Sequence, residues 1–406
     1  MPCVRQRIRP RRRRVRRSRD RHAHRANCPQ RESGSRISDR IVAIKVPSAD
    51  PTRNRVPDYS IWRRRGRAES NGVIACGLPE WSREMAGLIR TLTGAHDEGV
   101  RCMAMSSDGS RLLTGAPLDH VVMWDLNTGM IARHLFSGID DVPLAVAFSP
   151  DGTLVAAATE RHWVILLDAV SGAEKTRTPL SMTTEGTGVA FVDSASLLSA
   201  HGRRYSKYDL SLTEIKQFDG LQNGRIFDMS FPAGGRLVAS FHGFADPGEP
   251  EIMVWDLDAD QLFCSFARTA GKERTAMTLS PDGTRMLMGD IDGHISLAAM
   301  DSTPPGAIVR EFEPPSGAPA PALRKMVVGV AISQDLGFAV SGDEIGALRI
   351  WELSTGKELH RFDTGMTITT VALAPDSTFA VTGGWGQVGV AADGVAKVWD
   401  LSGIVV

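Results

Sequence analysis

The 406-residue sequence predicts an all-β fold assembled from repeated copies of one small unit. Three observations support this fold class. Short apolar runs along residues 86–406 follow the pattern of half-buried or fully buried strands. Turn signals of the Pro-Asp-Gly type stand between these runs. The order of turn, strand, turn and strand then recurs at intervals of 41–53 residues, which is typical of a repeat architecture.

Five clear copies of the unit share a turn, an apolar run, a second turn and a second apolar run. They are residues 106–129 (SSDGSRLLTGAPLDHVVMWDLNTG), 149–172, 280–302, 333–356 and 374–403. Two fainter copies, 190–212 and 231–260, fill the gaps between them. In the turns, proline presets φ at the second position, and Asp-Gly tolerates the conformations that close the turn. The sequence therefore predicts seven copies.

The second apolar run of most copies ends in Trp-Asp or in a reduced version of it. The equivalent final positions are 125, 168, 209, 256, 299, 352 and 400. The four copies that keep a tryptophan and an acid have Trp124-Asp125, Trp255-Asp256, Trp351-Glu352 and Trp399-Asp400. On these residues and this period, residues 86–406 resemble the WD40 repeat family. The resemblance implies a seven-bladed β-propeller with four strands per blade.

The resemblance also implies a hydrogen-bonded network of His, Ser or Thr, Asp and Trp in a well-formed blade, and here that network is incomplete. Gly94-Ala95-His96 approximates the histidine element, and Thr114, Ser341 and Thr382 occupy the hydroxyl position. Asp-Gly pairs match at Asp292-Gly293 and Asp393-Gly394, whereas the tryptophan positions of the second and fifth copies hold Leu167 and Ala298. We therefore expect apolar packing between strands to supply most of the stability.

The ends of the repeat region are expected to pair with each other. A repeat of this family begins with the outermost strand of the preceding blade, so residues 86–94 (AGLIRTLTG) should complete the blade formed by the last copy. A closed ring leaves only short, protected strand edges. The sequence therefore predicts a ring closed by its own N-terminal strand and monomeric by itself.

The net charge of zero conceals two different parts. Residues 1–85 hold 22 Arg and 1 Lys against 8 acidic residues, a net charge of +15; the remaining 24 basic and 39 acidic residues give −15. The first part lacks a sustained strand or helix period, and we interpret residues 1–85 as a disordered basic extension. Its most basic stretch, residues 9–25 (RPRRRRVRRSRDRHAHR), is typical of a phosphate-binding tail or a targeting peptide. A further hypothesis is that translation starts near Met85, so that the extension is not translated.

Catalytic and metal-binding motifs are not found. The five cysteines never form Cys-x-x-Cys, which argues against a disulfide framework or a zinc site. There is no P-loop, no Gly-x-Ser-x-Gly and no His-Glu-x-x-His. Asp290-Ile291-Asp292-Gly293 hints at a calcium loop but lacks the distal glutamate, so we interpret it as a turn. No apolar run is long enough to cross a membrane as a helix. We expect no cofactor.

Histidines recur at similar places in successive copies. They are His162, His201, His242 and His294. Although such a series suggests a ring of metal ligands, no acidic or cysteine co-ligands accompany it. We therefore interpret these histidines as polar residues at strand ends.

Three insertions point to a recognition surface. Residues 243–250 (GFADPGEP), 314–325 (PPSGAPAPALRK) and 384–392 (GWGQVGVAA) all fall in connections that topology places on one face of the ring. Loops on a rigid scaffold often carry recognition, and Trp and Arg frequently dominate interfaces. The candidate contact residues are Trp385, Phe244, Trp163, Arg161, Arg203 and Arg204. The alternative is that Trp163 packs between blades and the insertions are spacers.

The resemblance implies a non-catalytic scaffold that binds a protein or peptide partner. Two alternatives stay open: nucleic-acid association through the Arg-rich extension, which the acidic ring would oppose, and a propeller enzyme with an unrecognised pocket. The excess of Arg over Lys is typical of a GC-rich bacterial genome, and the reduced cysteines suit the cytoplasm.

Overall fold

The computed structural model describes residues 87–117, 121–135, 141–180, 186–202, 204–218, 225–232, 234–243, 248–269, 273–312, 326–386 and 394–404. The chain divides into two units, Met1–Ala75 and Cys76–Val406, and every described residue lies in the second. The predicted basic extension, residues 1–85, lies outside the described residues. Among those described, no helix is long and apolar enough to cross a bilayer.

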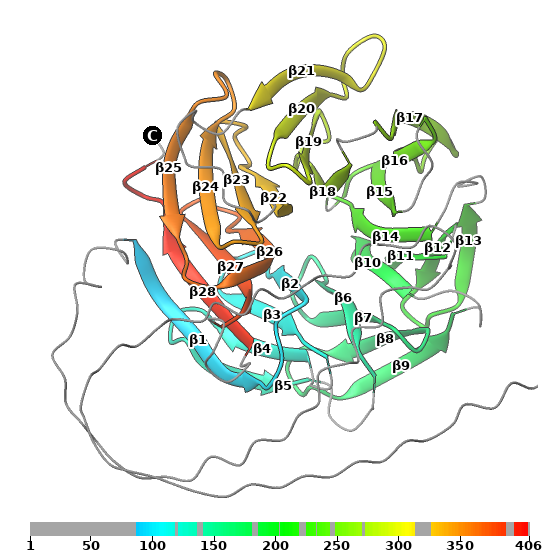
Figure 1. Ribbon diagram of the computed structural model, residues 1–406. Coiled ribbons are helices and arrows are strands. Elements are labelled where there is room, and N and C mark those ends of the chain that lie inside the picture. The colour runs from blue at the N-terminus through cyan, green and yellow to red at the C-terminus, as the bar shows by residue number, and fades with distance from the viewer. Residues whose placement is uncertain are drawn as a thin grey trace, which may run out of the picture. The chain divides into compact units, whose positions relative to one another are not determined.

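The described residues form seven antiparallel four-stranded sheets, which we call blades 1 to 7 and describe from inner to outer strand (Figure 1). Blades 1 to 3 are β2 (Cys102–Met105), β3 (Arg111–Gly115), β4 (Val121–Asp125), β5 (Met130–His134); β6 (Pro143–Phe148), β7 (Leu154–Thr159), β8 (Trp163–Asp168), β9 (Glu174–Pro179); β10 (Gly186–Asp193), β11 (Ser196–His201), β12 (Arg204–Asp209), β13 (Glu214–Phe218). Blades 4 and 5 are β14 (Arg225–Ser230), β15 (Leu237–Gly243), β16 (Pro250–Asp256), β17 (Gln261–Ala267); β18 (Arg274–Leu279), β19 (Arg285–Asp290), β20 (Ile295–Ala299), β21 (Ala307–Phe312). Blades 6 and 7 are β22 (Val327–Ile332), β23 (Phe338–Asp343), β24 (Ala347–Glu352), β25 (Glu358–Asp363); β26 (Thr367–Leu373), β27 (Phe379–Trp385), β28 (Gly394–Asp400), β1 (Leu88–His96).

The ring is closed as the sequence predicts. The N-terminal strand β1 pairs antiparallel with β28, with Leu88 opposite Trp399 and Leu92 opposite Ala396. Each innermost strand contacts the innermost strands of the blades before and after it, and β26 contacts β2 (Figure 1). All seven predicted repeats therefore form blades, and the fold is a seven-bladed β-propeller.

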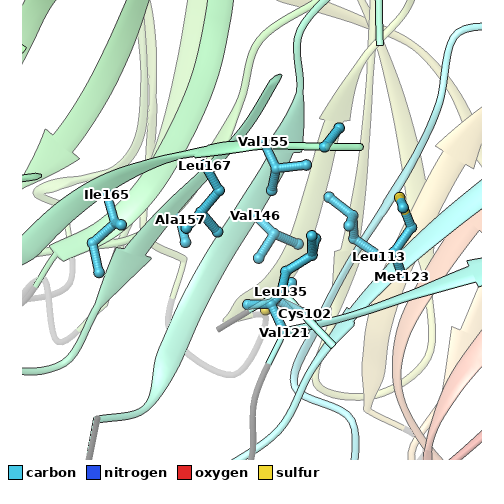
Figure 2. Close-up of a cluster of buried hydrophobic side chains, with 11 residues drawn as sticks. Cys102, Leu113, Val121, Met123, Leu135, Val146, Val155, Ala157, Ile165 and Leu167 are labelled. Atoms are coloured by element: carbon cyan, nitrogen blue, oxygen red, sulfur yellow. The ribbon is translucent and has the colours of Figure 1, made fainter. Parts of the chain in front are cut away.

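Apolar packing between neighbouring blades forms the core. Figure 2 shows the cluster between blades 1 and 2, where Leu113 and Met123 of one sheet meet Val155 and Leu167 of the next. Leu167 occupies a tryptophan position and is buried. The other reduced position, Ala298, lies between blades 4 and 5 in a cluster that also contains four methionines, Met277, Met286, Met288 and Met300.

The Ser and Thr side chains at the predicted hydroxyl positions accept hydrogen bonds from the tryptophans. The indole Nε1 of Trp124 donates to Thr114 Oγ1 (2.8 Å), and His96 Nε2 lies 2.7 Å from the same oxygen. Because His96 lies on β1, this network joins the closing strand to blade 1. Blades 6 and 7 have the tryptophan–hydroxyl bond without a histidine: Trp351 Nε1 donates to Ser341 Oγ (2.9 Å), and Trp399 Nε1 donates to Thr382 Oγ1 (3.0 Å).

Blade 4 departs from this arrangement. Ser240 faces Met253, in the register that Thr114 has in blade 1, but its Oγ lies 2.7 Å from His242 Nε2. Trp255 Nε1 is buried and has no hydrogen-bond partner among the described residues. A buried donor without a partner costs free energy. The tryptophan of blade 4 therefore lacks the bond that blades 1, 6 and 7 provide.

The innermost strands of blades 2 to 7 share a register shift near their first residues. The residues at the shift are Leu144, Thr187, Phe227, Thr275, Val328 and Thr369. Thr275 Oγ1 donates to Val327 O of blade 6 (2.6 Å), and Thr369 Oγ1 donates to Val100 O, which precedes blade 1. The threonines of blades 5 and 7 thus tie each blade to the next, which the leucine, phenylalanine and valine at this position cannot do.

Deletion of residues 86–94 is expected to yield an aggregating protein with a lowered melting temperature. The deletion removes the partner of β28 and exposes an unpaired strand edge, which is a template for association. Light scattering after size-exclusion chromatography and a thermal melt measure the effect, with deletion of residues 1–85 as the control that keeps β1. A monomeric protein with an unchanged melting temperature would contradict the closure.

Replacement of Trp255 by Phe is expected to destabilise the protein less than replacement of Trp351 by Phe. Both variants lose similar apolar volume, but Trp351→Phe also breaks the bond to Ser341, so its additional cost is about 1–2 kcal/mol. Urea unfolding of the two variants measures the difference, and Trp124→Phe should resemble Trp351→Phe. Equal free energies of unfolding for the three variants would contradict the role of the tryptophan–hydroxyl bond.

Candidate interaction surface

Strand direction divides the ring into two faces. Antiparallel order places the connections between blades and the connections between second and third strands on one face, which we call the loop face. The turns between first and second and between third and fourth strands lie on the opposite face, which we call the turn face. The three insertions follow β15, β21 and β27, so all of them leave the loop face. Phe244, Arg203 and residues 314–325 lie outside the described residues.

Trp385 ends β27 and packs on the connection between β1 and β2. A Cβ added to Gly99 would lie 2.4 Å from the Trp385 ring, so the indole rests directly on the glycine backbone. Next to this contact, Val100 N donates to Gly384 O (3.3 Å). Trp385 is half-buried and joins blade 7 to blade 1. Loss of a partner in a Trp385 variant would therefore not distinguish a contact role from a packing role.

Trp163 also takes part in packing. Its half-buried ring packs against the core between blades 1 and 2, and the Arg177 guanidinium lies 5.5 Å from the ring centroid. Arg161, two residues earlier, has an exposed side chain, and its backbone N–H donates to buried Asp141 Oδ1 (2.9 Å). Arg204 is half-buried and donates to Gln217 Oε1 (2.9 Å). The four described candidates therefore belong to blades 2, 3 and 7 rather than to one cluster.

Sequence reasoning missed two exposed apolar residues of the loop face. Phe227, at the register shift of β14, is 40% exposed, and Ile345, in the turn between β23 and β24, is 37% exposed. Asp343 shapes the second site, since its Oδ1 accepts from Ala347 N (2.8 Å) and its Oδ2 pairs with buried Arg349 (2.7 Å). An apolar residue inside a strand or a short turn gives no sequence signal of exposure.

Ion pairs strengthen the loop face where blade 4 leads into blade 5. Arg274 Nη1 lies 3.4 Å from Glu251 Oε2, and Arg268 Nη2 lies 2.8 Å from Glu273 Oε1. Burial raises the pKa of Glu251, although hydrogen bonds and the charge of Arg274 oppose the shift. Residues 290–293 form the expected turn, with Asp290 Oδ1 accepting from the backbone of Asp292 and His294 (2.9 Å each). Within the described ranges, no group of three potential metal ligands occurs.

The recurring histidines take different roles. His201 and His242 are buried and contact serines, with 3.1 Å between His201 Nε2 and Ser206 Oγ. Burial, followed by the charge of Arg204, lowers the pKa of His201 to about 4. His294 contacts Asp290 at the loop face (3.3 Å) and is half exposed. His201 and His242 are therefore packed inside blades 3 and 4 and do not face solvent.

Comparison with known proteins relates the chain to WD40 proteins. The family model of the WD domain, G-beta repeat matches residues 87–125 and 356–400. The crystal structure of RRP9 WD40 repeats superposes with a TM-score of 0.66 at 16% identity, covering 78% of this chain and 98% of that one. The fold is therefore that of a WD40 propeller.

Curated relatives share lower similarity over parts of their length. Pre-mRNA-processing factor 17 of Homo sapiens is 23% identical over 318 residues, covering 77% of this chain and 44% of that protein. U3 small nucleolar RNA-associated protein 15 homolog of Xenopus laevis is 27% identical over 207 residues, and autophagy-related protein 16 of Arabidopsis thaliana is 23% identical over 263. The matches cover 48% and 64% of this chain. The chain spans less than half the length of each of these three relatives.

Replacement of His201 by Gln is expected to reduce the acid sensitivity of the fold. The pKa of His201 is about 4 in the folded protein and 6.5 as its ordinary value, so the unfolded chain binds the additional proton between these values. The histidine therefore removes up to about 3 kcal/mol of stability as the pH falls through this window.

Urea unfolding of both proteins at pH 7 and near pH 4.5 measures the difference. The Asp228 carboxyl, whose pKa desolvation raises to about 6, acts in the opposite direction and is common to both proteins. The difference between them therefore isolates His201. Parallel pH profiles of the wild type and the variant would contradict the assignment.

Proposed function

We propose that the protein is a non-catalytic scaffold that binds a protein or peptide partner through the loop face of its propeller. The observation that carries this proposal is the pair of exposed apolar side chains, Phe227 and Ile345, on the face that also bears all three insertions. Loops carried by a rigid frame are typical sites of recognition. Arg161, Arg203 and the insertion residue Phe244 are proposed as further contacts.

The similarity to WD40 proteins supports a scaffold without choosing a pathway. The relatives are named for pre-mRNA processing, for a small nucleolar RNA and for autophagy, which are three different processes. A shared fold does not carry a shared partner. The partner is therefore to be found by experiment on this chain.

Substitution of Ile345 by Asp is expected to reduce partner binding about tenfold, because a charge in the centre of an apolar contact is desolvated without a counter-charge. The measurement is affinity capture from the native organism with quantitative mass spectrometry, followed by titration of the captured partner. The matched control is Leu359→Asp, since Leu359 lies in the same blade, is also 37% exposed, and belongs to the outer strand β25. Equal retention by both variants would contradict the loop-face proposal.

A further inference from the structure

The contact between blades 4 and 5 opens into a groove at the turn face. Its volume is about 480 Å³, and residues of two turns, 232 and 234–236 on one side and 281–284 on the other, line it. Buried Leu237 and Met300 form the floor, and half-buried Phe263 of β17 forms one wall. The groove thus presents an apolar base that solvent reaches from the turn face.

The first turn of blade 4 lacks a side-chain hydrogen bond that the equivalent turns of four other blades have. In blades 1, 2, 5 and 6 a serine Oγ donates to the aspartate two residues later, as Ser280 does to Asp282 (2.6 Å). Blade 4 has Phe231 and Ala233 at these positions, followed by two glycines. A Cβ added to Gly234, or to Gly283 of the facing turn, would meet nothing within 4 Å, so both turns border open space. In the described part of the blade 4 turn, Gly235 N donates to Pro232 O (2.8 Å).

The base of the groove is adaptable. The hydrophobic cluster between blades 4 and 5 that contains Met300 also contains Met277, Met286 and Met288. Methionine has a flexible, polarizable side chain that repacks around different partners. The floor can therefore accept an inserted side chain without breaking a hydrogen bond.

The rim of the groove is negative. Arg236 Nε lies 3.6 Å from Asp256 Oδ2, its guanidinium stands 5.9 Å from the Phe263 ring, and Arg285 pairs with Asp301. Both rim arginines therefore have carboxylate partners, whereas Asp282 has no ion pair among the described residues. Burial opposes ionisation of Asp282, but hydrogen bonds from Ser280 and Thr284 outweigh it and lower its pKa.

The turn face around the groove has the same sign. Its turns carry further aspartates whose pKa is lowered chiefly by hydrogen bonds from neighbouring hydroxyl and backbone groups: Asp108, Asp151, Asp168, Asp209, Asp335 and Asp400. These carboxylates stay ionised at neutral pH. A positively charged segment approaching this face is attracted before it makes contact.

We propose that the groove between blades 4 and 5 docks a basic segment of a partner protein, which inserts one aliphatic side chain against Leu237, Phe263 and Met300. Lysine or arginine residues that flank this side chain lie beside Asp282 and Asp301. This surface is opposite the loop face, so the proposal goes beyond the scaffold function and is independent of it. A chain with both surfaces would hold two partners on opposite sides of the ring.

A short fluorescent peptide with a central leucine flanked by lysines tests the proposal by anisotropy titration against the full chain. Two matched peptides replace the leucine by alanine or the lysines by glutamates. Phe263→Ala is expected to weaken the leucine peptide about tenfold and to change the alanine peptide little, since it removes the apolar wall. Asp301→Lys is expected to weaken binding of both lysine peptides, more strongly at low salt.

Glu160→Lys is the matched control, because it makes the same change of charge at an exposed residue of the loop face. It should leave binding unchanged, and circular dichroism verifies that every variant is folded. The proposal is overturned if no binding of the leucine peptide is detected at protein concentrations up to about 1 mM, since even a weak specific contact would be detected there. It is also overturned if the alanine peptide binds equally well, or if Glu160→Lys and Asp301→Lys weaken binding equally. None of these outcomes depends on Ile345, so the two surfaces are tested separately.

Discussion

The antiparallel pairing of β1 with β28 is the constraint on which the rest of the structure depends. Without it, seven sheets would form an open arc with two unsatisfied edges; with it, every innermost strand has neighbours on both sides. His96 adds a polar link, because it lies on the closing strand and reaches the hydroxyl that Trp124 of blade 1 also contacts. The antiparallel strand order within each blade then determines which connections share a face, and hence where partners can approach.

Much of the fold follows from the sequence, because strand period and turn chemistry are local. The seven copies, the closing strand, and the hydroxyl partners of Trp124, Trp351 and Trp399 could all be predicted. In blade 4 the prediction stops, since Ser240 can contact either Trp255 or His242, and only the packed structure determines which.

The candidate surface was less predictable for a related reason. A tryptophan at a strand end, such as Trp163 or Trp385, can point toward solvent or toward the next blade, and the sequence pattern is the same for both. Its orientation depends on distant residues, here Gly99 for Trp385 and Arg177 for Trp163. Exposed Phe227 and Ile345 were missed because isolated apolar residues in repeats resemble core positions. The groove between blades 4 and 5 gives no sequence signal, because its lining comes from two blades that lie far apart in the sequence.

The residue at the register shift of each innermost strand also sets how stiff the ring is around its circumference. Thr275 and Thr369 connect blade 5 to blade 6 and blade 7 to blade 1 through hydroxyl bonds near the loop face, whereas Phe227 leaves blades 4 and 5 without one there. Those two blades are joined at the other end, where Leu279 N donates to Ser230 Oγ (2.9 Å). At the loop face the same two blades are joined by Arg274 and Glu251, so an ion pair there takes the place of the hydroxyl bond that links blade 5 to blade 6 and blade 7 to blade 1.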